Sequence, residues 1–163
     1  MRKLIILTLA AIGFAACSQT NEKMSKCEND SWDKVFPKSE KVSHEKVTFV
    51  NRFGITLVAD LYKPLESDQL SAVSNQKFPA IACSGPFGAI KEQSSGLYAQ
   101  ALAERGFLTI AFDPSYTGES LGEPRYIASP DINTEDFCAA VDYLMTREDV
   151  NPEQVGIVAR IYA

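Results

Sequence analysis

The stretch that decides the fold is FPAIACSGPFGAIKEQSSGLYAQALAERGFLTIAF, residues 78–112. Two short apolar runs, Phe78–Cys83 and Phe107–Phe112, enclose a segment whose apolar residues have helical spacing. The unbroken apolar character of the second run is typical of a strand that is buried on both faces of a sheet. A strand, a helix and a second strand in this order predict two parallel strands joined by a crossover helix.

Both predicted helices carry signals at their ends. The first is followed by Gly106, which suits the position after a helix C-terminus. The second is predicted in NTEDFCAAVDYLMTRE, residues 133–148, where Phe137 and Leu144 follow helical spacing. Side chains that can cap the N-termini are Ser94 or Ser95 for the first helix and Asn133 or Thr134 for the second.

The chain on either side extends the sheet. Val155–Ala159 is apolar, follows a turn signal at 149–152 and predicts a third buried parallel strand. Upstream, Lys46–Asn51 and Ile55–Tyr62 alternate between apolar and polar residues and predict an antiparallel hairpin. The predicted fold class is therefore α/β, with an antiparallel edge hairpin followed by a mostly parallel sheet with flanking helices.

The first 17 residues resemble a bacterial lipoprotein signal. Arg2 and Lys3 form a short basic region, and the apolar stretch Leu4–Ala16 is too short to span a bilayer comfortably and ends in small residues before Cys17. The resemblance implies removal of residues 1–16, lipidation of Cys17 and an exported protein anchored to a membrane of the bacterial cell envelope. An ordinary secretory signal with a coincidental cysteine is the alternative.

Composition sets further limits on partners and cofactors. Residues 17–41 are polar and predict a flexible tether, and residues 42–163 predict one domain in a chain with 45% hydrophobic residues. The net charge of −5 argues against a nucleic-acid partner. Apart from Cys17, the cysteines are Cys27, Cys83 and Cys138, an odd number without metal-site spacing. We therefore predict unpaired thiols, no metal centre and no cofactor.

Ligands of parallel α/β sheets bind beyond the carboxyl ends of the strands. Residues 84–92 and 113–125 each follow a predicted strand end, so they share the predicted functional edge. The first loop offers backbone N–H groups at Phe87 and Gly88 that can stabilise an oxyanion, whereas Pro86 has no N–H. The alternative is a tight strand-to-helix turn that requires glycine for its conformation alone.

Three blocks of sequence together resemble a known family. They are GPFGAIKEQSSGLYAQALAERGF (85–107), AFDPSYTGESLGEPR (111–125) and SPDINTEDFCAAVDYL (129–144). In this order they are similar to the N-terminal part of bacterial α/β-hydrolases related to dienelactone hydrolases, acetyl xylan esterases and prolyl-peptidase-like proteins. The resemblance covers roughly residues 42–158. It implies an α/β-hydrolase fold and, in the complete protein, hydrolysis of a small ester or peptide substrate by a nucleophilic triad.

The resemblance also implies roles for single residues. The backbone N–H of Phe87 forms one half of an oxyanion hole, and the residues that line the substrate cleft are Gly85, Gly88, Asp113 and Tyr116. Family members often carry a histidine-proline or histidine-glycine pair where this chain has Gly85-Pro86. The alternative for Asp113 is a turn residue that binds its own backbone.

The family mechanism needs a nucleophile in a G-x-S-x-G turn after the strand at 155–159, then an acid and a histidine. Ile161 stands where the nucleophile belongs, and the only histidine, His44, precedes the first strand. Serines without a histidine predicted beside them are Ser84, Ser115 and Ser120. We therefore predict a truncated, inactive N-terminal fragment of a hydrolase.

Two other interpretations stay open. One is a non-catalytic binding or structural lipoprotein of the envelope, with a shallow ligand site between the loops 84–92 and 113–125. The other is a half-enzyme completed by a separate chain that carries the missing strands and triad. A flavodoxin-like or phosphate-binding domain is disfavoured, because no loop has the glycine pattern of those sites.

Overall fold

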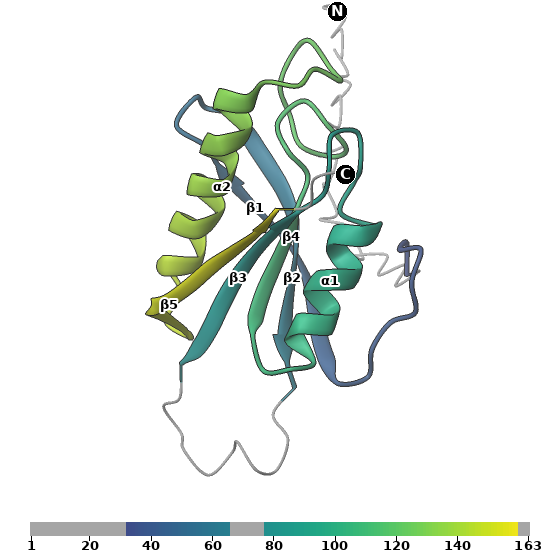
Figure 1. The fold of residues 1–163 in the computed structure, drawn as a ribbon, viewed down its shortest axis with the longest axis vertical. Coiled ribbons are helices and arrows are strands. Elements are labelled where there is room, and N and C mark those ends of the chain that lie inside the picture. Colours follow the sequence, from purple (N-terminus) through teal and green to yellow (C-terminus); the bar gives the residue numbers. More distant parts are fainter. Residues whose placement is uncertain (1–31, 66–76, 160–163) are drawn as a thin grey trace, which may run out of the picture. The chain divides into compact units, whose positions relative to one another are not determined.

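Five strands and two helices make up the described part of the protein (Figure 1). The structure is a computed structural model that describes residues 32–65 and 77–159. The predicted signal 1–16, Cys17, Cys27 and Ile161 lie outside the described residues. In chain order the elements are β1 (Val42–Val50), β2 (Thr56–Pro64), β3 (Phe78–Ser84), α1 (Ser94–Ala103), β4 (Leu108–Phe112), α2 (Pro130–Met145) and β5 (Val150–Ala159). Neither helix of the described ranges has the length and apolar character needed to cross a membrane.

The strands form one mixed sheet in the order β1-β2-β4-β3-β5. β1 pairs antiparallel with β2, and β2 pairs antiparallel with β4. β3 is parallel to both β4 and β5. The predicted α/β class, with an antiparallel edge hairpin and a mostly parallel sheet, is therefore confirmed.

The two helices cover opposite faces of the sheet (Figure 1). On one face Ala140 and Leu144 of α2 pack against alternate residues of the central strands, Leu108, Ile110 and Phe112 among them. On the other face Ala99 and Ala103 of α1 pack against Tyr62, Cys83 and Ala111. All of β4 is buried, which is the reason for its unbroken apolar sequence.

The first helix ends as predicted but begins differently. Gly106 has a φ of +97°, a left-handed conformation that favours glycine after a helix. Gln93 occupies the N-cap position of α1 without a side-chain hydrogen bond, so the caps predicted at Ser94 or Ser95 are wrong. The Gln93 side chain is used elsewhere, because its amide oxygen accepts from the Ile90 N–H at 3.4 Å.

The second helix begins earlier than predicted. α2 starts at Pro130, where proline is tolerated because the first N–H groups of a helix have no partner within it. The predicted caps at Asn133 or Thr134 are therefore wrong, and Ser129 is the N-cap residue, without a side-chain hydrogen bond. The Thr134 hydroxyl donates to the Pro130 carbonyl at 2.7 Å, within the first turn.

The last strand is longer and more exposed than predicted. The strand predicted at 155–159 forms the second half of β5, and its parallel pairing with β3 is confirmed. Its predicted burial is wrong, because Ile157 is 57% exposed. β5 is the last strand in the sheet order, so its outer edge has no neighbouring strand among residues 32–65 and 77–159.

Residues 32–41, here called the strap, pack on the domain, whereas the sequence placed them in a flexible tether. Phe36 is buried against Gly96 of α1, where an added Cβ would lie 3.0 Å from the Phe36 ring. Gln100 accepts a hydrogen bond from the Ser39 N–H at 3.1 Å and donates one to a strap carbonyl at 3.0 Å. The described part of the predicted tether is thus ordered by contacts with α1.

A buried carboxylate on β2 holds the start of the strap. Asp60 is fully buried, and its two oxygens lie 3.0 Å from Lys34 Nζ and 3.0 Å from His44 Nε2. Burial raises the pKa of Asp60, but the contacts with His44 and Lys34 outweigh it, so that this pKa lies below its usual value. The ionised form of Asp60 therefore stabilises the attachment of the strap.

We expect Phe36→Ala to lower the free energy of unfolding of the full chain by about 3 kcal/mol, because it empties a buried site beside Gly96. Urea denaturation followed by the fluorescence of Trp32, the single tryptophan, measures the change. Val35→Ala is the matched control, because Val35 is 78% exposed. Equal stability of the two variants would contradict the packing of the strap.

We expect the stabilising effect of Asp60 to disappear in acid. A lowered pKa in the folded state gives stability that is present above the unfolded pKa, near 3.8, and is lost as the pH falls through the folded value. The difference in unfolding free energy between the unmodified protein and Asp60→Asn should therefore be largest at neutral pH. It should shrink as the pH falls below about 3.8. Urea denaturation across the acid range measures it, with the exposed Glu148→Gln as control. A difference that does not change with pH would rule out this role of the Asp60 charge.

Candidate functional site

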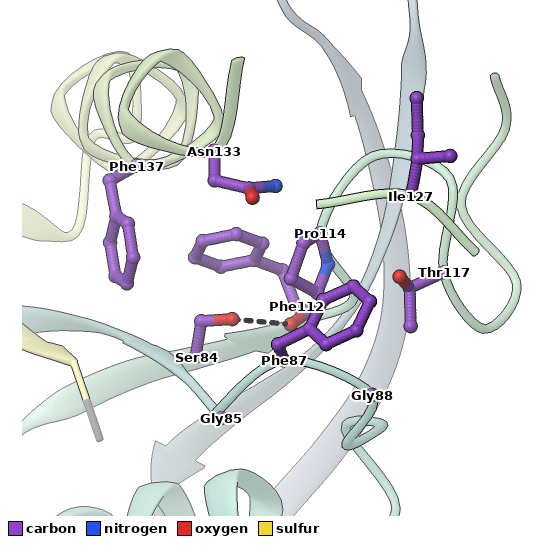
Figure 2. Close-up of a pocket in the computed structure, with 10 residues that line it drawn as sticks. All are labelled: Ser84, Gly85, Phe87, Gly88, Phe112, Pro114, Thr117, Ile127, Asn133 and Phe137. Atoms are coloured by element: carbon purple, nitrogen blue, oxygen red, sulfur yellow. Dashed lines mark hydrogen bonds between the residues drawn. The ribbon is translucent and has the colours of Figure 1, made fainter. Parts of the chain in front are cut away.

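A cavity lies at the carboxyl ends of β3 and β4 (Figure 2). Its volume is about 100 Å³, small beside the roughly 300–1,000 Å³ of sites that enclose a whole ligand. The lining residues are Ser84, Gly85, Phe87, Gly88, Phe112, Pro114, Thr117, Ile127, Asn133 and Phe137. The pocket thus brings together the two loops that the sequence placed on one functional edge, with the start of α2 as a third wall.

The first wall is a tight turn, residues 84–90, here called the glycine turn. Gly88 has a φ of +82°, a conformation that glycine adopts without strain, and the Ala89 N–H donates to the Pro86 carbonyl at 3.0 Å. Within the described ranges, no acceptor binds the N–H of Phe87 or of Gly88. The turn therefore requires its glycine, and it leaves the N–H groups of two pocket-lining residues, Phe87 and Gly88, without an acceptor among the described residues.

None of the three serines named in the sequence analysis donates its hydroxyl to a histidine. The Ser84 hydroxyl donates to the Phe112 carbonyl at 3.4 Å (Figure 2), and the Ser120 hydroxyl donates to the Asp113 carbonyl at 2.7 Å. The Ser115 hydroxyl donates to an Asp136 oxygen at 2.7 Å. His44 contacts Asp60, so the described residues contain no serine–histidine pair.

The four predicted cleft residues separate into two groups. Gly85 and Gly88 line the pocket, whereas Asp113 and Tyr116 do not. Asp113 is fully buried, and its carboxylate accepts the Glu119 N–H at 2.9 Å, which favours the alternative interpretation of Asp113 as a turn residue. Tyr116 has a φ of 71° and packs over Gly122, where an added Cβ would lie 2.6 Å from its ring.

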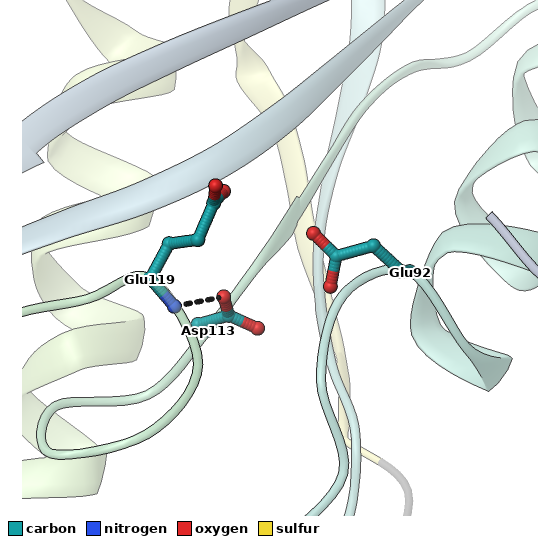
Figure 3. Close-up of side chains that lie close together, drawn as sticks. All are labelled: Glu92, Asp113 and Glu119. Carbon is teal, nitrogen blue, oxygen red and sulfur yellow. Dashed lines mark hydrogen bonds between the residues drawn. The ribbon is translucent and has the colours of Figure 1, made fainter. Parts of the chain in front are cut away.

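Asp113 belongs to a cluster of three carboxylates with Glu92 and Glu119 (Figure 3). Their oxygens lie within 4.8 Å of one another, a spacing that suits a cation. The cation present is the ammonium of Lys91, whose Nζ lies 2.5 Å from Glu92, 3.1 Å from Asp113 and 2.6 Å from Glu119. Burial lowers the pKa of Lys91, but the hydrogen bonds to these carboxylates outweigh it, so that this pKa is raised. Sequence reasoning missed Lys91, because nothing distinguishes it from an exposed loop lysine.

A second buried network supports the opposite wall of the pocket. Asp136 of α2 accepts hydrogen bonds from Asn51 Nδ2 at 2.8 Å and from the Ser115 N–H at 2.8 Å. Asn51 in turn accepts from the N–H groups of the β1–β2 turn. The network fixes α2 to the loop after β4, and with it Pro114 and Asn133 of the pocket wall.

The chain is similar in sequence to part of several longer proteins. The chain is 62% identical over 127 residues to the uncharacterized protein PA2218 of Pseudomonas aeruginosa, across 78% of this chain and 33% of that protein. It is 44% identical over 115 residues to YcjY of Escherichia coli K12, across 69% of this chain and 36% of that protein. It is also 28% identical over 119 residues to the thiohydrolase aneE of Aspergillus aculeatus, across 73% of this chain and 34% of that protein. The chain thus spans about a third of the length of these relatives.

Several solved structures superpose on this chain. The crystal structure of PA2218 superposes with a TM-score of 0.72 over 78% of this chain and 38% of that chain, at 62% identity. The α/β hydrolase GrgF of Penicillium sp. sh18 superposes with a TM-score of 0.61 at 25% identity, over 72% of this chain and 37% of that chain. The acetyl xylan esterase of Paenibacillus sp. R4 has a TM-score of 0.58 at 13% identity, over 77% of this chain and 43% of that chain, and shows the fold alone.

No protein-family profile matches the chain. The mixed five-stranded sheet with a helix on each face superposes on α/β-hydrolase structures. The described residues therefore form the N-terminal part of an α/β-hydrolase fold.

Proposed function

We propose that this chain supplies the oxyanion-binding part of an α/β-hydrolase that cleaves an ester, thioester or amide by nucleophilic attack. The observation that carries the proposal is the pair of unoccupied backbone donors, the N–H groups of Phe87 and Gly88, at a pocket beyond the strand ends. Attack on an acyl carbonyl places negative charge on its oxygen. Donors that are held in position for this charge lower the barrier, because they need no reorganisation when it forms.

The other walls of the pocket suit an acyl group. Phe112 and Phe137 present aromatic rings that lie edge to face, with centroids 5.0 Å apart, and Pro114 adds a further apolar surface. A volume of about 100 Å³ suits a small acyl group or the end of a longer chain. The relative named a thiohydrolase supports an acyl thioester, or a similar acyl compound, as the substrate class.

The nucleophile, the acid and the base of this reaction come from outside the described residues. The whole sequence contains one histidine, His44, which contacts Asp60 beside the strap. Each of the serines Ser84, Ser115 and Ser120 donates its hydroxyl to a backbone carbonyl or a carboxylate, and none to a histidine. We therefore propose that the 163 residues alone do not hydrolyse acyl substrates.

We expect the purified 163-residue chain to show no turnover of 4-nitrophenyl acetate or of an acetyl thioester. The positive test is a chimera in which residues 32–159 replace the aligned part of PA2218. In this chimera Phe87→Pro removes one donor and should lower kcat by about 100- to 1,000-fold. Phe87→Ala keeps the N–H and is the matched control.

Three results would contradict the proposed function. One is turnover by the 163-residue chain that is lost in His44→Ala. Another is equal activity of Phe87→Pro and Phe87→Ala in the chimera. The third is a folded but inactive chimera when PA2218 itself hydrolyses the same substrate, which would leave a non-catalytic binding role.

We also propose that the protein is exported and anchored to a bacterial membrane through Cys17. The order of basic, apolar and small residues before this cysteine supports the proposal. Several acyl chains on one residue bind firmly, since each buried methylene contributes about 0.8 kcal/mol.

We expect the full chain, produced in a bacterium that is fed an alkynyl fatty acid, to become labelled and to sediment with membranes. Cys17→Ser should abolish both properties, because it removes the acceptor thiol. Cys27→Ser is the matched control and should retain both. Labelling that persists in Cys17→Ser would contradict the proposal that the lipid is attached to Cys17.

A further inference from the structure

We propose that Lys91 is a positioning residue, which joins the glycine turn to the loop after β4 and so fixes the Phe87 and Gly88 donors relative to the opposite wall. The proposal rests on the proposed function for its catalytic meaning. Its structural basis is independent, because it follows from the contacts of one buried ammonium group.

The contacts of Lys91 join segments that are distant in sequence. Its side chain is fully buried, and its Nζ contacts the adjacent Glu92 before α1. It also contacts two residues that are distant in sequence, Asp113 directly after β4 and Glu119 in the loop that follows. Its backbone N–H donates to the second Asp113 oxygen at 2.7 Å. Lys91 therefore binds the strand end and the following loop with both its backbone and its side chain.

The loop after β4 closes around the same carboxylate. The Glu119 N–H donates to Asp113 at 2.9 Å. A Cβ at Gly118 would lie 2.2 Å from that carboxylate, so only glycine allows this approach. Thr117, the next residue back, lines the pocket together with Gly88 (Figure 2).

The distances along the chain are short on both sides of this junction. Gly88 stands three residues before Lys91, and Thr117 stands two residues before Glu119. A shift of the Lys91 ammonium would therefore move both pocket walls. The cluster joins the two loops that follow the carboxyl ends of β3 and β4, where the proposed oxyanion is bound.

The charges of the cluster favour a fixed geometry. Burial raises the pKa of Glu119, but hydrogen bonds from Lys46 and Lys91 outweigh it and hold this pKa below its usual value. The pKa of Lys91 is raised, so the pair of Lys91 and Glu119 stays ionised at neutral pH. Removal of the ammonium would leave the Asp113 carboxylate buried without a counter-charge, which costs free energy. Separation of the glycine turn from the loop after β4 would lower this cost, because it exposes the carboxylate to water.

Lys46 offers a matched control. Its Nζ contacts the same Glu119 at 2.8 Å, but it lies on β1 and its side chain is 42% exposed. Among the described residues its ion-pair partners are Asp33 and Glu119, and neither lies in the glycine turn. Loss of Lys46 therefore changes the charge near Glu119 and leaves the bridge to Lys91 in place.

The test is amide hydrogen exchange of the full 163-residue chain, read at Ala89 in the glycine turn and at Glu119 in the opposite loop. We expect Lys91→Met to speed exchange at both amides at least about tenfold, because a buried charged hydrogen bond is lost. The amides of β4 should not change, and Lys46→Met should leave Ala89 unchanged. Unchanged exchange at Ala89 in Lys91→Met would overturn the proposal.

A second variant keeps the test decisive if Lys91→Met unfolds the chain. Glu119→Gln alters a side chain that is 49% exposed, so the fold should persist. It should speed exchange at Ala89 by about two- to fivefold, because one ion pair of Lys91 is lost. An unchanged Ala89 amide in this folded variant would also overturn the proposal.

Catalysis in the PA2218 chimera tests whether Lys91 acts through the Phe87 donor. Lys91→Met should lower kcat at least about tenfold in the Phe87→Ala background and have little effect in the Phe87→Pro background. An equal loss of kcat in both backgrounds would mean that Lys91 has a general structural role, and it would overturn the proposal that Lys91 positions the Phe87 donor. A chimera that is inactive with Lys91 intact contradicts the proposed function alone, and hydrogen exchange then decides the role of Lys91.

Discussion

The buried pair of Lys91 and Asp113 is the contact on which the arrangement of the pocket depends. Asp113 directly follows the central strand β4, and Lys91 directly follows the glycine turn after β3. Two parallel strands place their loops at the same edge, but hydrogen bonds of the sheet do not fix how those loops lie relative to each other. A charge pair in a dry environment does so, because separation of its partners leaves each of them uncompensated.

The rest of the domain supports this edge from both faces. On the α1 side, the strap packs Phe36 against Gly96, and the Val35 N–H donates to the Glu92 carbonyl at 3.1 Å, next to Lys91. On the α2 side, Asp136 holds the loop after β4 through Ser115. The two pocket walls are thus each fixed to a helix layer, and Lys91 joins them. Such a frame suits the task of presenting backbone donors, which cannot adjust by side-chain rotation.

The sheet could be predicted from the sequence, but the charge network around Lys91 could not. Unbroken apolar runs and alternating runs report burial directly, so β3, β4 and the hairpin were predictable. The helix starts were harder to predict. Ser94 is a residue type that often caps a helix, but it lies inside α1, one residue after the N-cap position, and α2 already begins at Pro130. The burial of Lys91 could not be predicted, since it depends on three carboxylates that only the tertiary fold assembles. The predicted pocket residues Gly85 and Gly88 share the glycine turn, whereas Asp113 points into the network behind it.

The central claim is that the glycine turn holds an acyl oxyanion, and one structure tests it most directly. The PA2218 chimera with residues 32–159 of this chain would be crystallised after reaction with a small alkyl fluorophosphonate, whose phosphoryl oxygen takes the place of the oxyanion. We expect this oxygen to lie within roughly 2.7–3.1 Å of the Phe87 nitrogen. A phosphoryl oxygen that faces solvent or another part of the pocket, with the Phe87 N–H still unoccupied, would contradict it.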